Sequence, residues 1–328
     1  MAGRRVIVKV PASTANLGPG FDTLGMALSL YAWIQLSETE GETRIELYGE
    51  GLDGVPLDKT NLIYKVAQLV FEEAGVSVPE LNIAMYSDIP LARGLGSSAT
   101  AIVGALAAAN ALIGSPLTDD RLFQIATRLE GHPDNVGASL FGGIVVAAWD
   151  GERAEHIRLE PDPRLEVLVA IPAFELATEK ARHALPKQFG RGDAVFNVSH
   201  SSLLVAALAT GDLAMLRRAM RDRLHQPYRA PLIPGMAAIL EQAADRGALG
   251  AALSGAGPTL LALVERDSPD KAGLESFLLG TLRAEGVEAE ALRLKPCAAG
   301  PQVQVWDGAG AAAEAPAFMD WIKGEIRA

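Results

Sequence analysis

The sequence is short of two features that would point to particular classes of protein: cysteine and positive charge. One cysteine, Cys297, among 328 residues excludes an intramolecular disulfide framework and a cysteine-rich zinc site, and it suits a reducing, cytoplasmic compartment. The 29 basic residues are outnumbered by 40 acidic ones, which gives a net charge of -11. Because a nucleic-acid surface needs a basic stripe, we expect no nucleic-acid partner and a local site for any anionic ligand.

Long apolar runs are also missing. The longest weakly polar stretch, 99–114, has 16 residues, fewer than the ~20 that span a bilayer, so it predicts a buried helix and no membrane partner. The N-terminal segment 1–11 contains Arg4, Arg5 and Lys9 and is too charged for the apolar region of a signal peptide. We therefore expect a protein that is not exported.

Length and patterning predict two domains of mixed structure. At roughly 150 residues per domain the length favours two domains, and 49% hydrophobic residues are typical of a globular protein. Period-two alternation and helical spacing predict strands at 5–10, 32–38, 43–48, 81–86 and 144–149 and helices at 61–74, 99–114 and 118–130 in the first half. In the second half they predict strands at 165–171, 248–253, 260–264 and 289–294 and helices at 178–185, 201–223, 235–246 and 271–285.

The order of these elements predicts an α+β fold with helices on one face of a sheet. A polar segment with two prolines, 150–163, separates two apolar regions, and we place the domain boundary there. We expect an N-terminal domain at 1–155, a C-terminal domain at 156–305 and a tail at 306–328. In this tail a Gly/Ala linker, 307–316, precedes a short amphipathic segment, 318–326.

The most informative stretch is Pro90–Thr100, which lies between a predicted strand and an uninterrupted apolar helix. Gly94 and Gly96 allow backbone N–H groups to approach an anion, and a helix that begins near Ser97 adds unpaired N–H donors and a positive dipole end. The segment therefore predicts a phosphate cradle. The alternative is a tight strand-to-helix turn in which the glycines serve the backbone alone.

Two other phosphate loops do not fit this stretch. Gly94–Ala99 satisfies the dinucleotide fingerprint G-x-G-x-x-A, but the acidic residues about 20 positions later, Asp119 and Asp120, fall at a helix start and not at a strand end. No G-x-x-x-x-G-K-[ST] pattern is present, which excludes the ordinary P-loop. These mismatches argue against a nicotinamide-dependent dehydrogenase and leave a serine-bearing phosphate loop of another type.

Two further loops complete a pattern. Pro11–Asp22 follows the first strand, and Leu253–Thr259 is a glycine turn between two short strands. Together with Pro90–Thr100 they resemble the three motifs of the kinase superfamily that includes galactokinase, homoserine kinase, mevalonate kinase and phosphomevalonate kinase. The likeness to the homoserine kinase family is the closer one, although Ser13 and Thr14 stand in swapped order. Four more segments look like family segments: Glu130–Asn135, Ala138–Gly143, Thr178–Pro186 and Gln226–Gly235.

This resemblance implies a two-domain small-molecule kinase fold, with a ribosomal-protein-S5-like N-terminal domain and a ferredoxin-like C-terminal domain. ATP and substrate would meet in the cleft between them. The implied reaction is transfer of the γ-phosphoryl group of Mg-ATP to the side-chain hydroxyl of L-homoserine, a step towards threonine, with ATP and Mg²⁺ as cofactors. Members of the family are often homodimers.

The resemblance also assigns residues to nucleotide and metal. Ser98 and Glu130 would hold Mg²⁺, which prefers hard oxygen ligands and keeps several waters; the alternative for Glu130 is a solvated carboxylate at a helix end. Asn61 is similar to a family position near adenine, and its alternative is a helix N-cap. The residues expected around ATP are Asn61, Pro90, Leu91, Ala92, Arg93, Gly94, Leu95, Gly96, Ser97, Ser98, Ala99 and Thr100.

The resemblance assigns a second set of residues to catalysis and substrate binding. Asp22 suits an ammonium group, and Arg182 with Arg229 resembles a pair that clamps a carboxylate, a task for the planar guanidinium fork. Asp134 would act either as a general base or as an orienting and electrostatic group, and we favour the second role. The residues expected to contact substrate are Asn16, Asp22, His132, Asn135, Thr178, Arg182 and Arg229, and those assigned to catalysis are Ser98, Glu130, Asp134 and Asn135. The alternative for His132 is a buried hydrogen bond within its turn.

Two other functions stay open. One is a kinase of the same superfamily for another small alcohol such as mevalonate or shikimate, but mevalonate has no ammonium group for Asp22. The other is a non-catalytic member that binds nucleotide. Such a protein would be expected to lose Ser98, Glu130 or the Asp134–Asn135 pair, and the sequence retains all of them.

Overall fold

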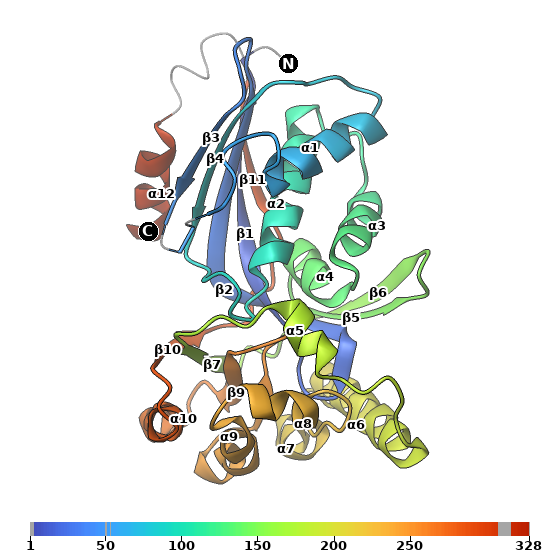
Figure 1. Ribbon diagram of the computed structural model, residues 1–328, viewed down its shortest axis with the longest axis vertical. Helices are drawn as coiled ribbons and strands as arrows, with labels where there is room; N and C mark the ends of the chain where they lie inside the picture. Colours follow the sequence, from blue (N-terminus) through green and yellow to red (C-terminus); the bar gives the residue numbers. More distant parts are fainter. Residues whose placement is uncertain (1–2, 50, 53, 308–315, 328) are drawn as a thin grey trace.

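The computed structural model describes residues 3–49, 51–52, 54–307 and 316–327, and it contains two sheets, one above the other in Figure 1. The upper sheet has the order β11-β1-β2-β4-β3, with β5 paired to β2 and β6 to β5. All its pairs are antiparallel except β3 with β4. Its strands are β1 (Arg5–Asn16), β2 (Gly20–Glu38), β3 (Arg44–Tyr48), β4 (Leu81–Ser87), β5 (Ile144–Trp149), β6 (Ala154–Leu159) and β11 (Gln302–Trp306).

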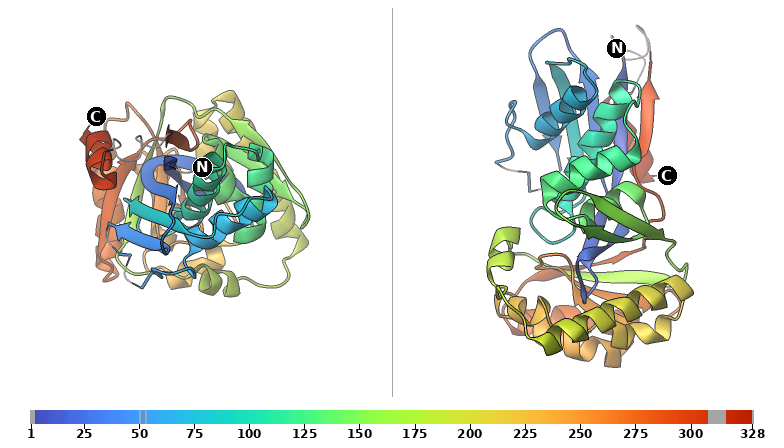
Figure 2. Two further views of the ribbon diagram at one scale, coloured as in Figure 1. Left: turned by 90° about the horizontal axis from the view of Figure 1, so that it is seen from above. Right: turned by 90° about the vertical axis from the view of Figure 1, so that its right-hand side faces the viewer.

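Helices cover both faces of this sheet. Four of them lie on one face, and α12 (Phe318–Arg327) lies on the opposite face (Figures 1 and 2). Ile322 of α12 is fully buried and packs in a cluster with Ile7, Trp33 and Ala84 of the sheet. The four helices of the first face are α1 (Leu62–Glu73), α2 (Ser97–Leu112), α3 (Asp119–Glu130) and α4 (Asp134–Phe141).

The composition of α2 explains its central place. Fourteen of its 16 residues are buried, and most of them are alanine or another small residue, so other elements can pack closely around the helix. At Gly104 an added Cβ would lie 2.6 Å from the Cδ1 atom of Ile34, so the helix packs closely on β2 and a larger residue here would require the Ile34 side chain to move. The prediction of a buried helix in this stretch is confirmed.

The lower sheet has four antiparallel strands in the order β10-β7-β9-β8, which is 4-1-3-2 in chain order and is ferredoxin-like. Its strands are β7 (Leu165–Pro172), β8 (Gly250–Leu253), β9 (Leu260–Glu265) and β10 (Ala289–Leu294). The helices below it are α6 (Arg191–Thr210), α7 (Leu216–Ala219), α8 (Gln226–Arg229), α9 (Met236–Gln242) and α10 (Lys271–Ala284), with 3₁₀ turns at Leu213–Met215, Ala230–Leu232 and Ala243–Arg246. The short helix α5 (Thr178–His183) lies above the sheet and faces the upper half (Figure 1). The expected α+β fold is confirmed.

Several predicted elements differ from the structure. The segment expected as a boundary, 150–163, contains β6, which pairs with β5 and extends the upper sheet. The single helix expected at 201–223 is α6, which begins ten residues earlier, followed after Gly211 by short turns; Gly211 has a positive φ of 69° and ends the helix. Strand β11 and helix α4 were not anticipated. The domain limits 1–155, 156–305 and 306–328 stay a prediction.

The β1–β2 hairpin is the largest departure. Pro11–Asp22 reads as a loop because it is rich in turn residues, yet β1 runs on to Asn16 and β2 begins at Gly20. Register shifts between Pro11 and Ala12 and between Ala15 and Asn16 bend the strands. The bend carries the hairpin tip down to the lower half, where the side-chain amide of Asn16 donates to the Gly255 carbonyl oxygen at 2.9 Å.

The tail contains the expected amphipathic helix, α12. Most of the expected Gly/Ala linker, 308–315, lies outside the described residues. Among the described residues, no helix has both the length and the apolar character needed to cross a membrane.

Candidate active site

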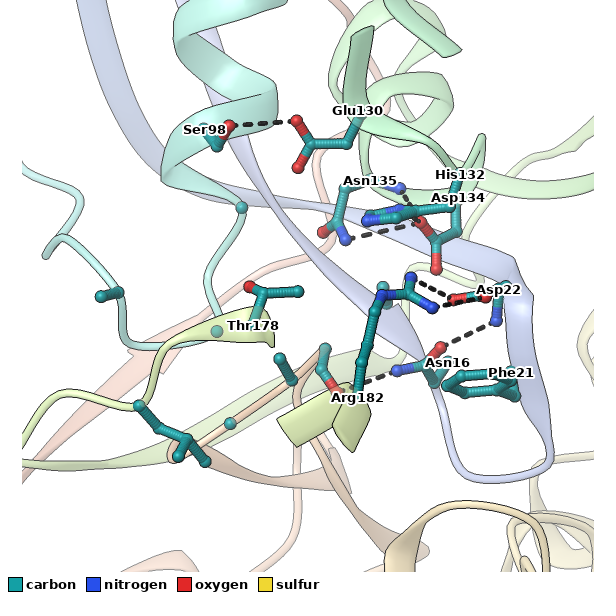
Figure 3. A pocket seen from close by; sticks show the side chains of 18 of the residues that line it. Asn16, Phe21, Asp22, Ser98, Glu130, His132, Asp134, Asn135, Thr178 and Arg182 are labelled. Atoms are coloured by element: carbon teal, nitrogen blue, oxygen red, sulfur yellow. Dashed lines mark hydrogen bonds and ion pairs between the residues drawn. The ribbon is translucent and has the colours of Figure 1, made fainter. Parts of the chain in front are cut away.

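A cavity of about 250 Å³ lies between the two halves of the molecule. The β1–β2 hairpin, the loop before α2 and the turn before α4 meet there with α5, α8 and the turn between β8 and β9 (Figure 3). Fourteen residues expected at the site line this cavity: Asn16, Asp22, Ala92, Gly94, Gly96, Ser97, Ser98, Glu130, His132, Asp134, Asn135, Thr178, Arg182 and Arg229.

The loop before α2 is held by backbone contacts from both halves. The amide of Ser13 donates to the Leu95 carbonyl, and the amide of Thr259 donates to the Arg93 carbonyl, both at 3.2 Å. The Ser254 hydroxyl donates to the Gly94 carbonyl at 2.6 Å. At the start of α2, Gly96 has a φ of 72° and no side chain caps the helix, so the N–H groups of its first turn are open to an anion.

A hydroxyl and a carboxylate face each other at one end of the cavity. The Ser98 hydroxyl donates to Glu130 Oε2 at 3.0 Å (Figure 3). Ser98 lies in the first turn of α2 and Glu130 at the end of α3. A hydroxyl and a carboxylate are the hard ligands that Mg²⁺ accepts. Within the described residues no group of three or more His, Cys, Asp or Glu side chains gathers to hold a metal, so a cation here would need phosphate or water ligands as well.

The carboxylate of Asp134 lies beside this pair and is almost fully buried. Its Oδ1 atom accepts from the Asn135 amide at 2.7 Å and lies 2.6 Å from His132 Nδ1. Burial lowers the pKa of His132, but its hydrogen bond to Asp134 and the charges of Asp134, Glu130 and Asp22 outweigh that effect, so the pKa is raised above 6.5. The expected turn hydrogen bond of His132 is thus present, and it fixes Asp134.

A bidentate ion pair occupies the opposite end. Arg182 Nη1 and Nη2 donate to the two carboxylate oxygens of Asp22 at 3.0 and 2.8 Å. Hydrogen bonding to Asp22 raises the pKa of Arg182. The side chains are 36% and 33% exposed, so both groups can reach a ligand in the cavity. Figure 3 shows Asp134 and Asn135 between this pair and the Ser98–Glu130 pair.

Arg229 is the buried cation of the site, with only 2% of the residue exposed. Its Nε donates to the Ala181 carbonyl at 3.2 Å and its Nη1 to the Gly255 carbonyl at 3.0 Å. Burial lowers the pKa of Arg229 to about 10, and the positive charge of Arg182 acts in the same direction. Arg182 and Arg229 both line the cavity.

Seven expected residues do not line the cavity. Asn61 caps α1 by accepting from the Ile63 amide, so its N-cap alternative is confirmed, and a contact with adenine stays a prediction. Arg93 points to the second half of the chain, where it donates to the Ala173 carbonyl at 2.7 Å. The other five are Pro90, Leu91, Leu95, Ala99 and Thr100, which belong to the loop and helix around the cavity.

Six lining residues were not predicted: Ala15, Phe21, Leu176, Gly255, Ala256 and Gly257. Phe21 and the glycine turn belong to motifs that the sequence singles out, but without a polar group they gave no reason for a role. The Phe21 ring contacts both cations: its centre lies 5.7 Å from the Arg182 guanidinium carbon and 5.3 Å from that of Arg229.

This geometry agrees with two family descriptions. Residues 61–143 match the GHMP kinases N terminal domain, and residues 204–276 match the GHMP kinases C terminal domain. The fold and these two matches therefore define the class of protein as a GHMP kinase. A solved mevalonate kinase from Methanococcus jannaschii, with a TM-score of 0.64 and 17% identity over 90% of this chain and 99% of that one, shares the fold alone.

More similar relatives narrow the class. A homoserine kinase of Moorella thermoacetica is 46% identical over 291 residues, which cover 89% of this chain and 97% of that protein. One of Deinococcus radiodurans is 44% identical over 301 residues, 92% of this chain and 97% of that protein. The crystal structure of homoserine kinase from Cytophaga hutchinsonii has a TM-score of 0.83 and 29% identity over 92% of this chain and 97% of that one. The chain belongs to the homoserine kinase family of GHMP kinases.

Proposed function

We propose that the protein transfers the γ-phosphoryl group of ATP to the side-chain hydroxyl of L-homoserine. The observation that carries this proposal is the order of groups along the cavity. Oxygen ligands for a cation and open N–H donors lie at one end, and charges complementary to an amino acid lie at the other. Asp134 and Asn135 lie between them, where a hydroxyl of the substrate would meet the phosphoryl group.

The charged end fits a zwitterion. Asp22 would take the substrate ammonium, and Arg182 and Arg229 would take its carboxylate as a pair of guanidinium donors. Asp22 and Arg182 neutralise each other, so an amino acid could exchange its own two charges for that pair. A substrate with a carboxylate but no ammonium, such as mevalonate, leaves Asp22 without an opposite charge from the ligand.

Phosphoryl transfer depends on positioning and charge stabilisation more than on covalent chemistry. The N–H groups at the start of α2 would bind phosphate oxygens, and Ser98 with Glu130 would hold Mg²⁺. That cation supplies neutralisation of charge on the phosphates when bound. Asn135 would orient the substrate hydroxyl. The side-chain amide of Asn135 is held in place because the Ser13 hydroxyl donates to its Oδ1 atom at 3.0 Å. Asp134 would orient the same hydroxyl and stabilise charge, held by His132.

The test is ADP release from Mg-ATP with L-homoserine, mevalonate, shikimate, galactose or no acceptor. The proposal expects strong stimulation by L-homoserine alone, and loss of that stimulation in Arg182→Ala and Arg229→Ala while ATP still binds. Stimulation by another alcohol would keep the phosphate end and overturn the substrate assignment. ATP binding without any stimulated release would favour a non-catalytic protein.

A further inference from the structure

His225 is a buried histidine that the roles described above do not use. It has no exposed surface and precedes α8, the helix that carries Arg229. Its Nε2 atom lies 2.7 Å from the Gly18 carbonyl oxygen, and its Nδ1 atom lies 3.3 Å from Nη1 of Arg229. One nitrogen of the imidazole therefore contacts the β1–β2 hairpin, and the other contacts Arg229, which lines the cavity.

These two contacts fix the tautomer. A carbonyl oxygen only accepts, so Nε2 carries the proton and donates to Gly18. An arginine only donates, so Nδ1 must offer a lone pair to Arg229. Burial is the largest effect and lowers the pKa of His225; the carboxylates of Asp222 and Asp22 and the hydrogen bond to Gly18 oppose it, the charge of Arg229 acts with it, and the pKa stays lowered. The neutral ring is thus the form that satisfies both neighbours.

The contact with His225 means that Nε and both N–H groups of Nη1 of Arg229 all have acceptors within the protein. Of the five guanidinium N–H donors, one goes to Ala181, one to Gly255 and one to His225. No hydrogen bond from Nη2 to the described residues is present, and Arg229 lines the cavity, so the two N–H groups of Nη2 are left for a ligand. The rotation of the guanidinium plane is set by three acceptors, and His225 is the only side chain among them.

The other nitrogen of His225 reaches the hairpin that carries Asp22. Gly18 has a φ of +92°, and an added Cβ would lie 2.2 Å from the Met220 carbonyl oxygen, so this backbone is packed tightly against the lower half. The His225 ring also stacks on Phe21, with ring centres 5.2 Å apart and planes at 28°. One side chain thus links the group expected to bind the substrate carboxylate to the hairpin expected to bind its ammonium.

We propose that His225 is a positioning residue for acceptor binding, which aims Arg229 at the substrate carboxylate through its Nδ1 lone pair. This inference rests on the proposed function, because it assumes that Arg229 meets an amino-acid carboxylate. It does not follow from a contact between His225 and substrate, since the imidazole does not line the cavity. Loss of the lone pair frees the guanidinium to rotate and weakens acceptor binding without touching the phosphate loop.

Three substitutions separate the two contacts. His225→Leu removes both. His225→Asn places an amide oxygen near the position of Nδ1 and can still accept from Arg229, whereas His225→Gln places an amide nitrogen near Nε2 and keeps only the donor to Gly18. We expect His225→Leu to raise KM for L-homoserine about tenfold, as loss of a hydrogen bond to a charged group does, with KM for ATP within twofold. His225→Asn should recover most of the loss, and His225→Gln should not.

Steady-state kinetics with each substrate varied in turn, together with thermal unfolding of each variant, decide the matter. Equal rises in both KM values, or rescue by Gln as good as rescue by Asn, would mean that His225 serves the fold alone and would overturn the proposal. An unchanged KM for L-homoserine in His225→Leu would overturn it as well. If the wild-type protein shows no release of ADP with L-homoserine, the proposed function fails and this inference falls with it.

Discussion

Gly94 provides a direct test of the phosphate loop, because backbone atoms fill the place of its side chain. Its φ is +79°, and an added Cβ would lie 2.4 Å from the Ser254 carbonyl oxygen and 3.0 Å from the N and O atoms of Gly257. Replacement by alanine therefore imposes two costs. The left-handed backbone costs roughly 1–2 kcal/mol for an L-residue. Relief of the contact requires a shift of about 1 Å, the difference between 2.4 Å and an ordinary contact at 3.4 Å.

Gly286→Ala is a matched control. Gly286 has a φ of +75° and no atom within 4 Å of an added Cβ, and it does not line the cavity. This variant carries the backbone cost without the collision. We expect Gly286→Ala to lose roughly 1–2 kcal/mol of unfolding free energy from the backbone alone, and Gly94→Ala to lose more because the collision adds to that cost. Only Gly94→Ala should lose activity, by about 100-fold in kcat/KM for ATP, because a displacement of ~1 Å in a positioning group has an effect of that size.

The assay is ADP release at varied ATP concentration with the acceptor saturating, together with urea unfolding of both variants. A Gly94→Ala protein whose kcat/KM for ATP stays within threefold of wild type would refute the reasoning. So would an equal loss of activity in Gly286→Ala, since the effect would then come from backbone strain alone. Normal kinetics with normal stability would mean that the loop adapts without displacing its N–H groups.

Three further predictions concern metal, substrate and tail. Ser98→Ala should raise the Mg²⁺ concentration for half-maximal rate about tenfold, because one of two expected protein ligands is lost; a magnesium titration at fixed ATP checks this, and an unchanged midpoint would remove Ser98 from the metal site. Asp22→Asn should raise KM for L-homoserine at least tenfold, because the substrate ammonium loses its carboxylate partner. KM for 4-hydroxybutanoate, which lacks the ammonium group, should stay unchanged. The substitution should cost less than about 1 kcal/mol of unfolding free energy, because the ion pair is about one-third exposed. Ile322→Ala, at a fully buried position of α12, should cost about 2 kcal/mol in urea unfolding with kinase activity retained, and lost activity would show that α12 supports the site.

Elements with strong local periodicity were predictable from the sequence. Strand β10 has the predicted bounds, Ala289–Leu294, and α3 begins at Asp119 behind the N-cap Thr118, one residue from the expected start. Their signals lie within the segment itself. Strand β11 alternates Gln and Val, but it is five residues long and its partner β1 lies almost 300 positions away, so only tertiary pairing defines it.

In the candidate site, too, residues within local motifs were predictable and contacts between distant segments were not. Ser98, Glu130, Asp134 and Asn135 were predicted because they stand in motifs, and the structure brings all four to one cavity. That Asp22 and Arg182 pair with each other was not predictable, because 160 positions separate them and no local pattern reports a contact across two halves. The contact between His225 and Arg229 joins the N-cap of α8 to its last residue and is therefore local, but the role proposed for it also depends on Gly18, which is more than 200 positions away.

The pairing of β1 with β11 has a consequence for how the protein is made. Arg5 stands opposite Trp306, so one flank of a strand that is among the first to be synthesised has no partner until nearly the whole chain exists. The four strands of the lower sheet lie between these positions and are complete by Leu294. During synthesis on a ribosome the ferredoxin-like half can therefore assemble before β11 is available to pair with β1. A chain that stops short of β11 exposes an open strand edge, the kind of surface that recruits other chains and aggregates.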